Sequence, residues 1–414
     1  MKKAITLVLV IALALTSIFA NGASEGSAKV EKKELLVWLP PNTKTSVLDI
    51  DFWTKTLAPW AEEHNAKIEI EIIPWGEYEA KYLTGFSSGE GPDVGYMYLE
   101  MINDYIDMGL LEDLNKHFTE EEKSQYIYYD QGFINGGQYA MPFIVGNQRL
   151  YYFNMDILNA AGVTELPSTW AEFRDVLLKV KESNPNVVPF GQQWGDAAVG
   201  TMNTSYYPFF WQAGGELFTN GKFTLTDNDA AIRSLQFLYD LRFKDGLIPD
   251  ECLAWSSATL AQEFNKGRVA CVVESTSAGK NKFGNVNWQY VPSLKDKTEA
   301  IWTACDSLIV NADSDNVDLA VELVKFMTSS EVMTEYHTKV TTYPPLTKSE
   351  PYSDDERFLP LLDMTELYHT MPVAKGSAAV NERFFKSVQL MMMGELTPEQ
   401  VIENVVKYVK STNK

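Results

Sequence analysis

A strand, a helix and a second strand follow one another within forty residues of this chain, and this pattern constrains the fold most. Residues 34–39 are a short apolar run that ends at Pro40 and Pro41, as expected for a buried strand. Residues 52–64 have the pattern of a helix, and residues 67–73 alternate, with isoleucines on one face. A βαβ unit pairs its strands in parallel, so the sequence predicts an α/β fold.

Further strands and helices are indicated by apolar runs and by helix caps. Strands are predicted at residues 94–98, 269–273 and 307–311. Helices are predicted after N-terminal caps that pair Thr169 with Glu172, Thr226 with Asp229, and Thr397 with Gln400. Each of these helices carries apolar residues on one face, which is typical of helices that cover a sheet.

The N-terminus has the features of a cleavable signal peptide, predicted at residues 1–20. Lys2 and Lys3 precede an apolar run at residues 7–15, and the small residue Ala20 precedes a polar stretch. The apolar run is about half of the roughly 20 residues that a membrane span needs. The first cysteine is Cys252, so no thiol lies near the mature N-terminus to carry a lipid. We therefore expect an exported protein, periplasmic or extracellular, without a lipid anchor.

Composition narrows the classes of function. The net charge is -21, or -23 once Lys2 and Lys3 are removed with the signal peptide. Such a surface repels nucleic acid and anionic lipid. About 390 residues remain after processing, which suffices for two domains. The four histidines and three cysteines show no metal-ligand spacing, and no glycine-rich phosphate loop occurs. The sequence therefore predicts no metal and no cofactor.

Several short motifs follow one another in a fixed order along the mature chain. They are SGEGPDV at residues 88–94, GLLEDL at 109–114, YAMP at 139–142, YFNMD at 152–156, PSTW at 167–170 and FNKGRVA at 264–270. No motif is specific alone, but their order and spacing are. By these motifs the chain resembles the family 1 extracellular solute-binding proteins of bacterial ABC importers, over nearly the whole mature sequence.

The resemblance implies a type II periplasmic-binding-protein fold, in which two α/β lobes are joined by a hinge that the chain crosses more than once. The first lobe is expected at residues 24–147 and 309–355, and the second at residues 148–308 and 356–414. The crossings are then expected near residues 147–152, 306–309 and 353–357.

The resemblance also implies a sugar site between the lobes. Sugars present C–H patches and hydroxyl groups, so their sites combine flat aromatic faces with polar side chains. The candidate ligand-binding residues are Asn42, Thr43, Trp75, Tyr98, Glu100, Asn147, Trp194, Tyr206, Glu274, Ser275, Trp302, Asp306, Arg383 and Phe384. One departure from the family pattern is Met97, which stands where the family has a stacking aromatic residue.

These observations predict a monomeric binding protein, and not an enzyme, that captures a carbohydrate and delivers it to permease subunits in the membrane. Two alternatives stay open. A secreted glycoside hydrolase needs only two carboxylates about 5 to 10 Å apart, for which Glu100 and Glu274 are candidates. A binding protein for a polyol or a glycerol phosphoester is the other alternative. Closure around a ligand requires no reactive group, which favours binding.

Overall fold

The structure of the protein is a computed structural model that describes most of the chain. It covers residues 32–42, 46–196, 199–219, 221–284, 286–340, 343–353, 355–372 and 374–412, apart from the side chains of Gly76, Glu100 and Val199. The predicted signal peptide and the candidate site residue Thr43 lie outside these ranges. Residues 33–414 form one compact unit.

The first sheet has five strands in the order β2-β1-β3-β14-β6. These strands are β1 (Lys33–Leu39), β2 (Ala66–Ile72), β3 (Val94–Tyr98), β6 (Met141–Gly146) and β14 (Ala304–Val310). β1 pairs in parallel with β2 and places Val37 opposite Ile70. The helix α1 (Ser46–Glu63) connects them and buries Trp53 and Leu57 on one face. The predicted βαβ unit is therefore confirmed, and so is the third strand at residues 94–98.

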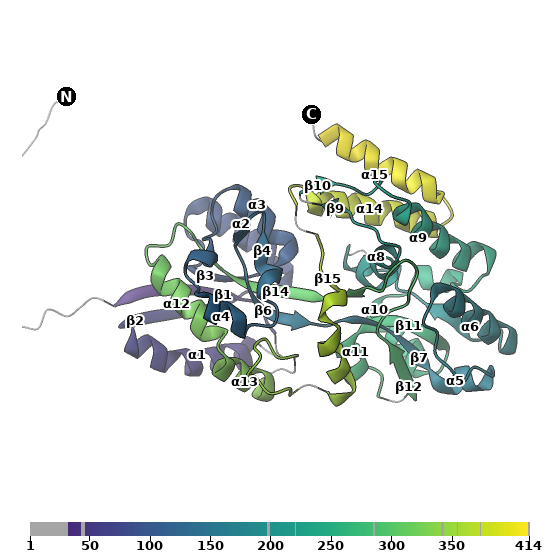
Figure 1. Cartoon of the computed structure of the whole chain (residues 1–414), viewed down its shortest axis with the longest axis horizontal. Helices are drawn as coiled ribbons and strands as arrows, with labels where there is room; N and C mark the ends of the chain where they lie inside the picture. The colour runs from purple at the N-terminus through teal and green to yellow at the C-terminus, as the bar shows by residue number, and fades with distance from the viewer. Residues whose placement is uncertain are drawn as a thin grey trace, which may run out of the picture. The chain divides into compact units, whose positions relative to one another are not determined.

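The other elements of the first lobe surround this sheet. The helices are α2 (Tyr78–Ser88), α3 (Leu99–Asp107), α4 (Glu120–Gln125), α12 (Val317–Met327) and α13 (Ser330–Lys339). Three single-turn helices are η1 (Trp75–Glu77), η2 (Leu114–Lys116) and η3 (Tyr129–Gly132), and a short hairpin joins β4 (Phe133–Ile134) to β5 (Gly137–Gln138). α12 packs against β14 and β3, as Figure 1 shows. Strands separated by some 200 residues of sequence thus share one core.

The second sheet has four strands in the order β12-β7-β11-β8. They are β7 (Arg149–Asn154), β8 (Val188–Gly191), β11 (Val269–Ser275) and β12 (Trp288–Val291). β7 runs antiparallel to β11 and β12, whereas β8 and β11 are parallel. The predicted strand at residues 269–273 is confirmed. Each sheet has its own covering helices, which gives the two-lobed α/β architecture that the sequence predicts.

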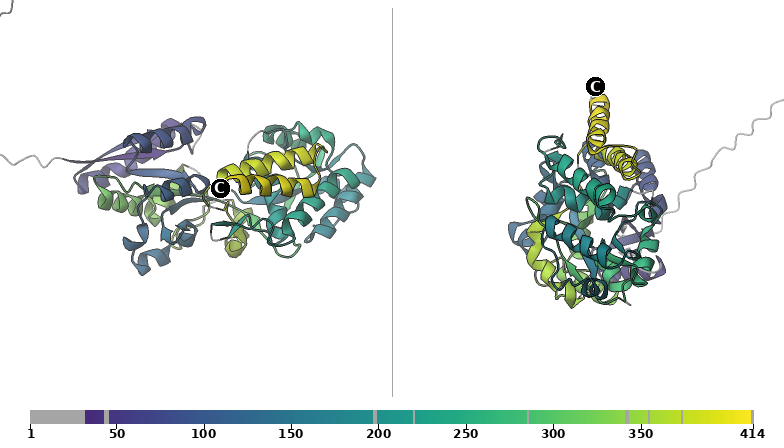
Figure 2. Two further views of the ribbon diagram at one scale, coloured as in Figure 1. Left: turned by 90° about the horizontal axis from the view of Figure 1, so that it is seen from above. Right: turned by 90° about the vertical axis from the view of Figure 1, so that its right-hand side faces the viewer.

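The second lobe is rich in helices. They are α5 (Met155–Ala160), α6 (Trp170–Ser183), α7 (Met202–Ser205), α8 (Tyr207–Gln212), α9 (Ala230–Tyr239), α10 (Ser257–Asn265), α11 (Thr276–Asn281), α14 (Ser377–Met392) and α15 (Pro398–Thr412). Shorter elements are η4 (Val199–Thr201), the π-helix η5 (Asp240–Lys244), η6 (Asp250–Leu253) and the hairpin of β9 (Phe218–Thr219) and β10 (Lys222–Phe223). Figure 2 shows α14 and α15 lying side by side, and both contact α9.

Two of the three predicted helix caps are confirmed. Thr169 and Glu172 form a complete capping box at the start of α6. Thr397 and Gln400 hydrogen-bond each other's backbone at the start of α15. The cap predicted at Thr226 is wrong, because α9 begins only at Ala230, whose backbone N–H donates to the side chain of Asn228.

The chain passes between the two sheets more than once, as predicted. The first passage is residues 147–148 between β6 and β7, where Asn147 has a left-handed backbone with φ of 52°. The second lies between β13 (Ile301–Trp302) and β14, which pairs in the first sheet from Ala304 onward. The crossing that the resemblance implies near residues 306–309 lies within β14 itself. The third segment runs through residues 343–353 into the long 3-10 helix η7 (Glu356–Leu367) and β15 (Tyr368–His369).

No helix in the described part of the chain has the length and the apolar character needed to span a membrane.

Candidate functional site

A cavity of about 210 Å³ lies beside the second passage between the lobes. The first lobe contributes Trp75, Tyr98 and Leu99, and α7 of the second lobe contributes Asn203. Every residue from Trp302 to Asp306 lines the cavity. Thr370 and Met371, which come directly after β15 in the sequence, also line it. We call this space the hinge cavity. Because both lobes contribute to it, a ligand bound here contacts both of them.

Trp75 is held in place by a hydrogen bond from its indole nitrogen, while much of its ring is exposed to solvent. It begins η1 directly after Pro74, and its indole Nε1 donates to the carbonyl oxygen of Pro41 at 3.3 Å. The ring meets Tyr96 edge-on, with 6.0 Å between centroids. The residue is nevertheless 48% exposed. An open aromatic face of this kind can pack against the apolar surface of a ligand.

Asp306 adds a carboxylate to the lining of the hinge cavity. It lies in β14, in register with Tyr98 of β3, and its Oδ2 accepts a hydrogen bond of 2.6 Å from the hydroxyl of Tyr96. Burial raises the pKa of Asp306 to about 6, although the bond from Tyr96 and the charge of Arg149 act to lower it. At neutral pH most of this carboxyl group is ionised, and it acts as a hydrogen-bond acceptor.

Trp302 is fixed by a cation and does not present an open ring. It is 5% exposed, and the guanidinium carbon of Arg149 lies 4.5 Å from the centre of its ring. Arg149 also donates to the carbonyl oxygen of Asn147, within the first passage between the lobes. Burial lowers the pKa of Arg149, whereas the nearby charges of Glu274 and Asp306 raise it. Trp302 therefore bounds the cavity, and Trp75 is the more accessible aromatic surface.

Three other predicted site residues, Asn42, Glu274 and Ser275, are not among the residues that line this cavity. Asn42 follows β1 and is half-buried. Glu100 lies in the first turn of α3, and its side chain is outside the described part of the structure. Glu274 is buried at the end of β11 and accepts a bond of 3.2 Å from Ser257. Ser275 caps α11 through the backbone N–H of Ala278.

Four predicted site residues are placed elsewhere in the second lobe. Trp194 is 2% exposed, and its Nε1 donates to Gln192. Tyr206 and Phe384 are fully buried against each other, with 5.1 Å between their rings, in the core that joins α8 to α14. Arg383 is exposed on α14. The run of aromatic residues around Tyr206 is apolar on every side, which is typical of a buried helix rather than of a binding surface.

Sequence reasoning missed several residues that line the hinge cavity. Asn203, Thr303, Thr370 and Met371 carry no motif and lie in different segments of the chain. Thr370 and Met371 are positioned because β15 pairs with β13, which precedes the second passage between the lobes. Of the predicted residues that line the cavity, the ends of strands pointed to Trp75 and Tyr98, and the expected second crossing pointed to Trp302 and Asp306.

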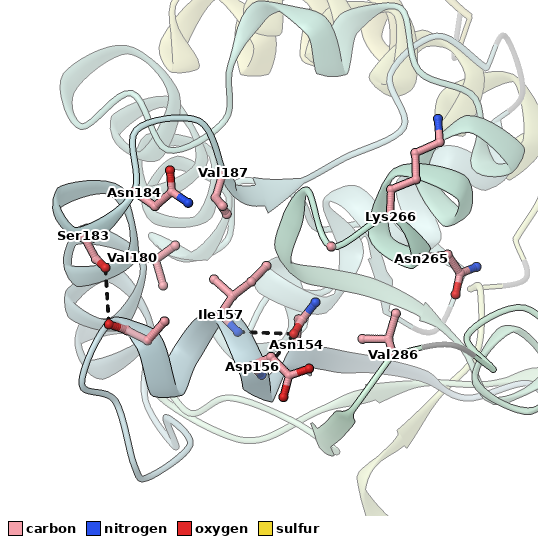
Figure 3. Close-up of a pocket in the computed structure, with 12 residues that line it drawn as sticks. Asn154, Asp156, Ile157, Val180, Ser183, Asn184, Val187, Asn265, Lys266 and Val286 are labelled. Atoms are coloured by element: carbon pink, nitrogen blue, oxygen red, sulfur yellow. Dashed lines mark hydrogen bonds between the residues drawn. The ribbon is translucent and has the colours of Figure 1, made fainter.

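A larger cavity of about 410 Å³ lies in the second lobe alone (Figure 3). Its lining residues include Ile157, Val180, Asn184 and Lys266. The side chain of Asn154 is already engaged, because it caps α5 by accepting from the backbone at 3.1 and 3.3 Å. A ligand bound within one lobe does not distinguish open from closed arrangements of two lobes. The hinge cavity is therefore the better candidate for the functional site.

Within the described residues, no cluster of three histidine, cysteine or acidic side chains is arranged to hold a metal ion. All three cysteines are buried. Of the described residues that line the hinge cavity, Asp306 alone carries a carboxylate, and none is a lysine or an arginine. The described lining of the cavity thus offers aromatic surface, uncharged hydrogen-bonding groups and one carboxylate, that of Asp306.

Comparison with known proteins places this geometry in a family. The galactooligosaccharide-binding protein of Bacillus subtilis is 24% identical over 350 residues, which cover 80% of this chain and 77% of the relative. The solved structure of a solute-binding protein from Thermotoga lettingae, bound to α-D-tagatose, has a TM-score of 0.71 at 20% identity and covers 92% of this chain and 99% of its own. The cyclic α-maltosyl-1,6-maltose-binding protein of Arthrobacter globiformis has a TM-score of 0.75 at 18% identity and covers 92% and 98%.

These structures share the two-lobed type II periplasmic-binding fold, so the fold predicted from the sequence is confirmed. The model of the family described as bacterial extracellular solute-binding protein matches residues 48–334. That match covers more than half of the chain, and it agrees with a cavity that both lobes line. The protein therefore belongs to the bacterial extracellular solute-binding proteins.

Proposed function

We propose that the protein is the substrate-binding component of an ABC importer and captures a carbohydrate in the hinge cavity. The observation that carries the proposal is a cavity built by both lobes, with the open ring of Trp75 and the carboxylate of Asp306. Aromatic faces together with hydrogen-bond acceptors are what a polyhydroxylated ring needs. The names of the relative from Bacillus subtilis and of the solved structures, which bind sugars, support the same ligand class.

The mechanism follows from the position of the cavity. A ligand that touches both lobes binds more tightly when they close on it, and this difference in affinity shifts the protein toward the closed state. We propose that the closed monomer then delivers the sugar to permease subunits in the membrane. For the lobes we propose the predicted division, except that β14 belongs to the first lobe from Ala304, where its pairing begins.

The two alternatives receive less support from the cavity. A glycoside hydrolase needs a pair of carboxylates flanking the bond that is cleaved, and the described lining residues include only Asp306. A phosphoester is favoured by cationic or clustered N–H groups, and no lysine or arginine is among the described lining residues. A neutral sugar fits the cavity best.

Binding should occur without turnover. We expect a carbohydrate to bind with micromolar or tighter affinity, a binding free energy of about -8 kcal/mol or better. Isothermal titration calorimetry measures the affinity, and chromatography of the sugar after long incubation measures its integrity. A product that appears with the wild type and disappears in Glu274→Gln or Asp306→Asn would support the hydrolase instead.

The mature protein should begin at Asn21 or Ser24 and carry no lipid. We infer this from the cleavable signal pattern and from the absence of a cysteine before Cys252. The intact mass of material secreted by the expressing cell tests it. A mass that starts at Met1, or one increased by acyl chains, would contradict the inference and indicate a membrane-anchored protein.

A further inference from the structure

A second cavity of about 310 Å³ adjoins the hinge cavity. Leu99, Thr370 and Met371 line both spaces, so the two cavities meet along these three residues. The second cavity is also shared between the lobes. Its first-lobe side includes Phe133 of the β4–β5 hairpin, and its second-lobe side includes Phe218 of the β9–β10 hairpin.

Phe133 is held outward by the hairpin that carries it. β4 and β5 pair Phe133 with Gln138, and the turn between them contains Asn135 with a left-handed backbone, φ 51°. The side-chain nitrogen of Asn135 donates to Asn103 of α3 at 2.9 Å. This bond ties the turn to the helix that begins at Leu99. Phe133 is 54% exposed, so its position is set while its ring remains accessible.

The polar groups of the second cavity complement this ring. Asp130 and Gln131 lie just before Phe133 and line the same space, and Thr370 lies at its junction with the hinge cavity. Each cavity therefore presents one half-exposed aromatic ring from the first lobe, Trp75 or Phe133, together with hydrogen-bonding side chains. This repetition of an aromatic surface beside polar groups suits a ligand whose own chemistry repeats along its length.

We propose that the second cavity binds a further sugar unit of the ligand held in the hinge cavity, so that the ligand is an oligosaccharide whose chain passes Thr370 and Met371. This proposal rests on the carbohydrate function proposed above. Phe133 is then a residue that selects chain length, because only a ligand of two or more units reaches it. Phe218 and Asp130 contribute to the same subsite from either side.

The test compares sugars of increasing length on matched variants. The probes are glucose, maltose and maltotriose, galactose and its β-linked di- and trisaccharide, and N-acetylglucosamine with its di- and trimer, each titrated by calorimetry. In the series that binds, we expect the wild-type affinity to rise about tenfold or more from one unit to two. Phe133→Ala should lose about tenfold for the longer sugars and keep the affinity for the single unit. Phe133→Tyr, which retains the ring, should behave as the wild type.

Phe243→Ala is the matched control, since Phe243 is also exposed, at 41%, but lies on η5 and lines neither cavity. It should bind every length as the wild type does. If one and two units bind equally and Phe133→Ala binds every length normally, the second subsite is refuted while carbohydrate binding stands. If no sugar of any series binds the wild type, the carbohydrate function itself is refuted, and the subsite with it.

Discussion

Replacing Trp75 with alanine should weaken carbohydrate binding by about 2 kcal/mol or more, which is roughly 30-fold in the dissociation constant. The ring is half exposed and lines the hinge cavity, so its removal deletes contact area with the ligand. Because little of the ring is packed inside the lobe, the free energy of unfolding should change by less than about 1 kcal/mol. Titration calorimetry and denaturant melts on the same protein measure both quantities.

Trp194→Ala provides the contrasting variant. Trp194 is 2% exposed and its indole donates within the second lobe. Its removal should lower the free energy of unfolding by about 3 to 5 kcal/mol, the cost of a large-to-small change in a packed interior. The protein that remains folded should bind sugar nearly as the wild type does. The opposite pattern, with normal binding by Trp75→Ala and weak binding by a stably folded Trp194→Ala, would show that the ligand site lies elsewhere.

Acidification should stabilise the ligand-free protein through Asp306. Its pKa in the folded protein is about 6, above the ordinary value of 3.8, and burial is the main cause. Between about pH 4 and pH 6 the folded state therefore holds a proton that the unfolded chain has lost. The stability from this group is fully present below pH 4 and is lost as the pH rises through 6, by up to about 3 kcal/mol.

Asp306→Asn isolates this contribution, because an amide keeps the shape of the group but does not titrate. Denaturant melts at pH 4.5 and pH 7.5 should show that the wild type gains stability relative to Asp306→Asn at the lower pH. Asp51→Asn is the control, since Asp51 is exposed on α1, and it should follow the wild type at both values. An equal pH response of wild type and Asp306→Asn would mean that this carboxylate titrates like an exposed one.

Much of the fold could be predicted from the sequence because it rests on local patterns. The apolar run at residues 34–39 and the alternation at residues 67–73 became β1 and β2, and the capping box of Thr169 and Glu172 starts α6. These signals involve residues a few positions apart. Two local patterns were less informative. Thr226 does not cap α9, and β14 begins at Ala304, three residues before the predicted strand.

The candidate site could be predicted only in part, because some of the predicted aromatic residues are buried in the core. Trp75, Trp194 and Tyr206 are all aromatic candidates from the sequence, yet the first is half exposed and the other two are buried. The side chain of an aromatic residue reaches solvent or core according to what packs against it. For Tyr206 those partners include Phe384 of α14, about 180 positions away.

The sequence by itself determined the α/β class, the order of most strands and helices, and the family resemblance, because these depend on local periodicity and on the order of motifs. Only the tertiary structure decided which residues share the hinge cavity. Trp75, Asn203, Asp306 and Thr370 meet there because β14 enters the first sheet from late in the chain and β15 pairs with β13. Such contacts depend on the packing of distant segments, and no local pattern encodes them.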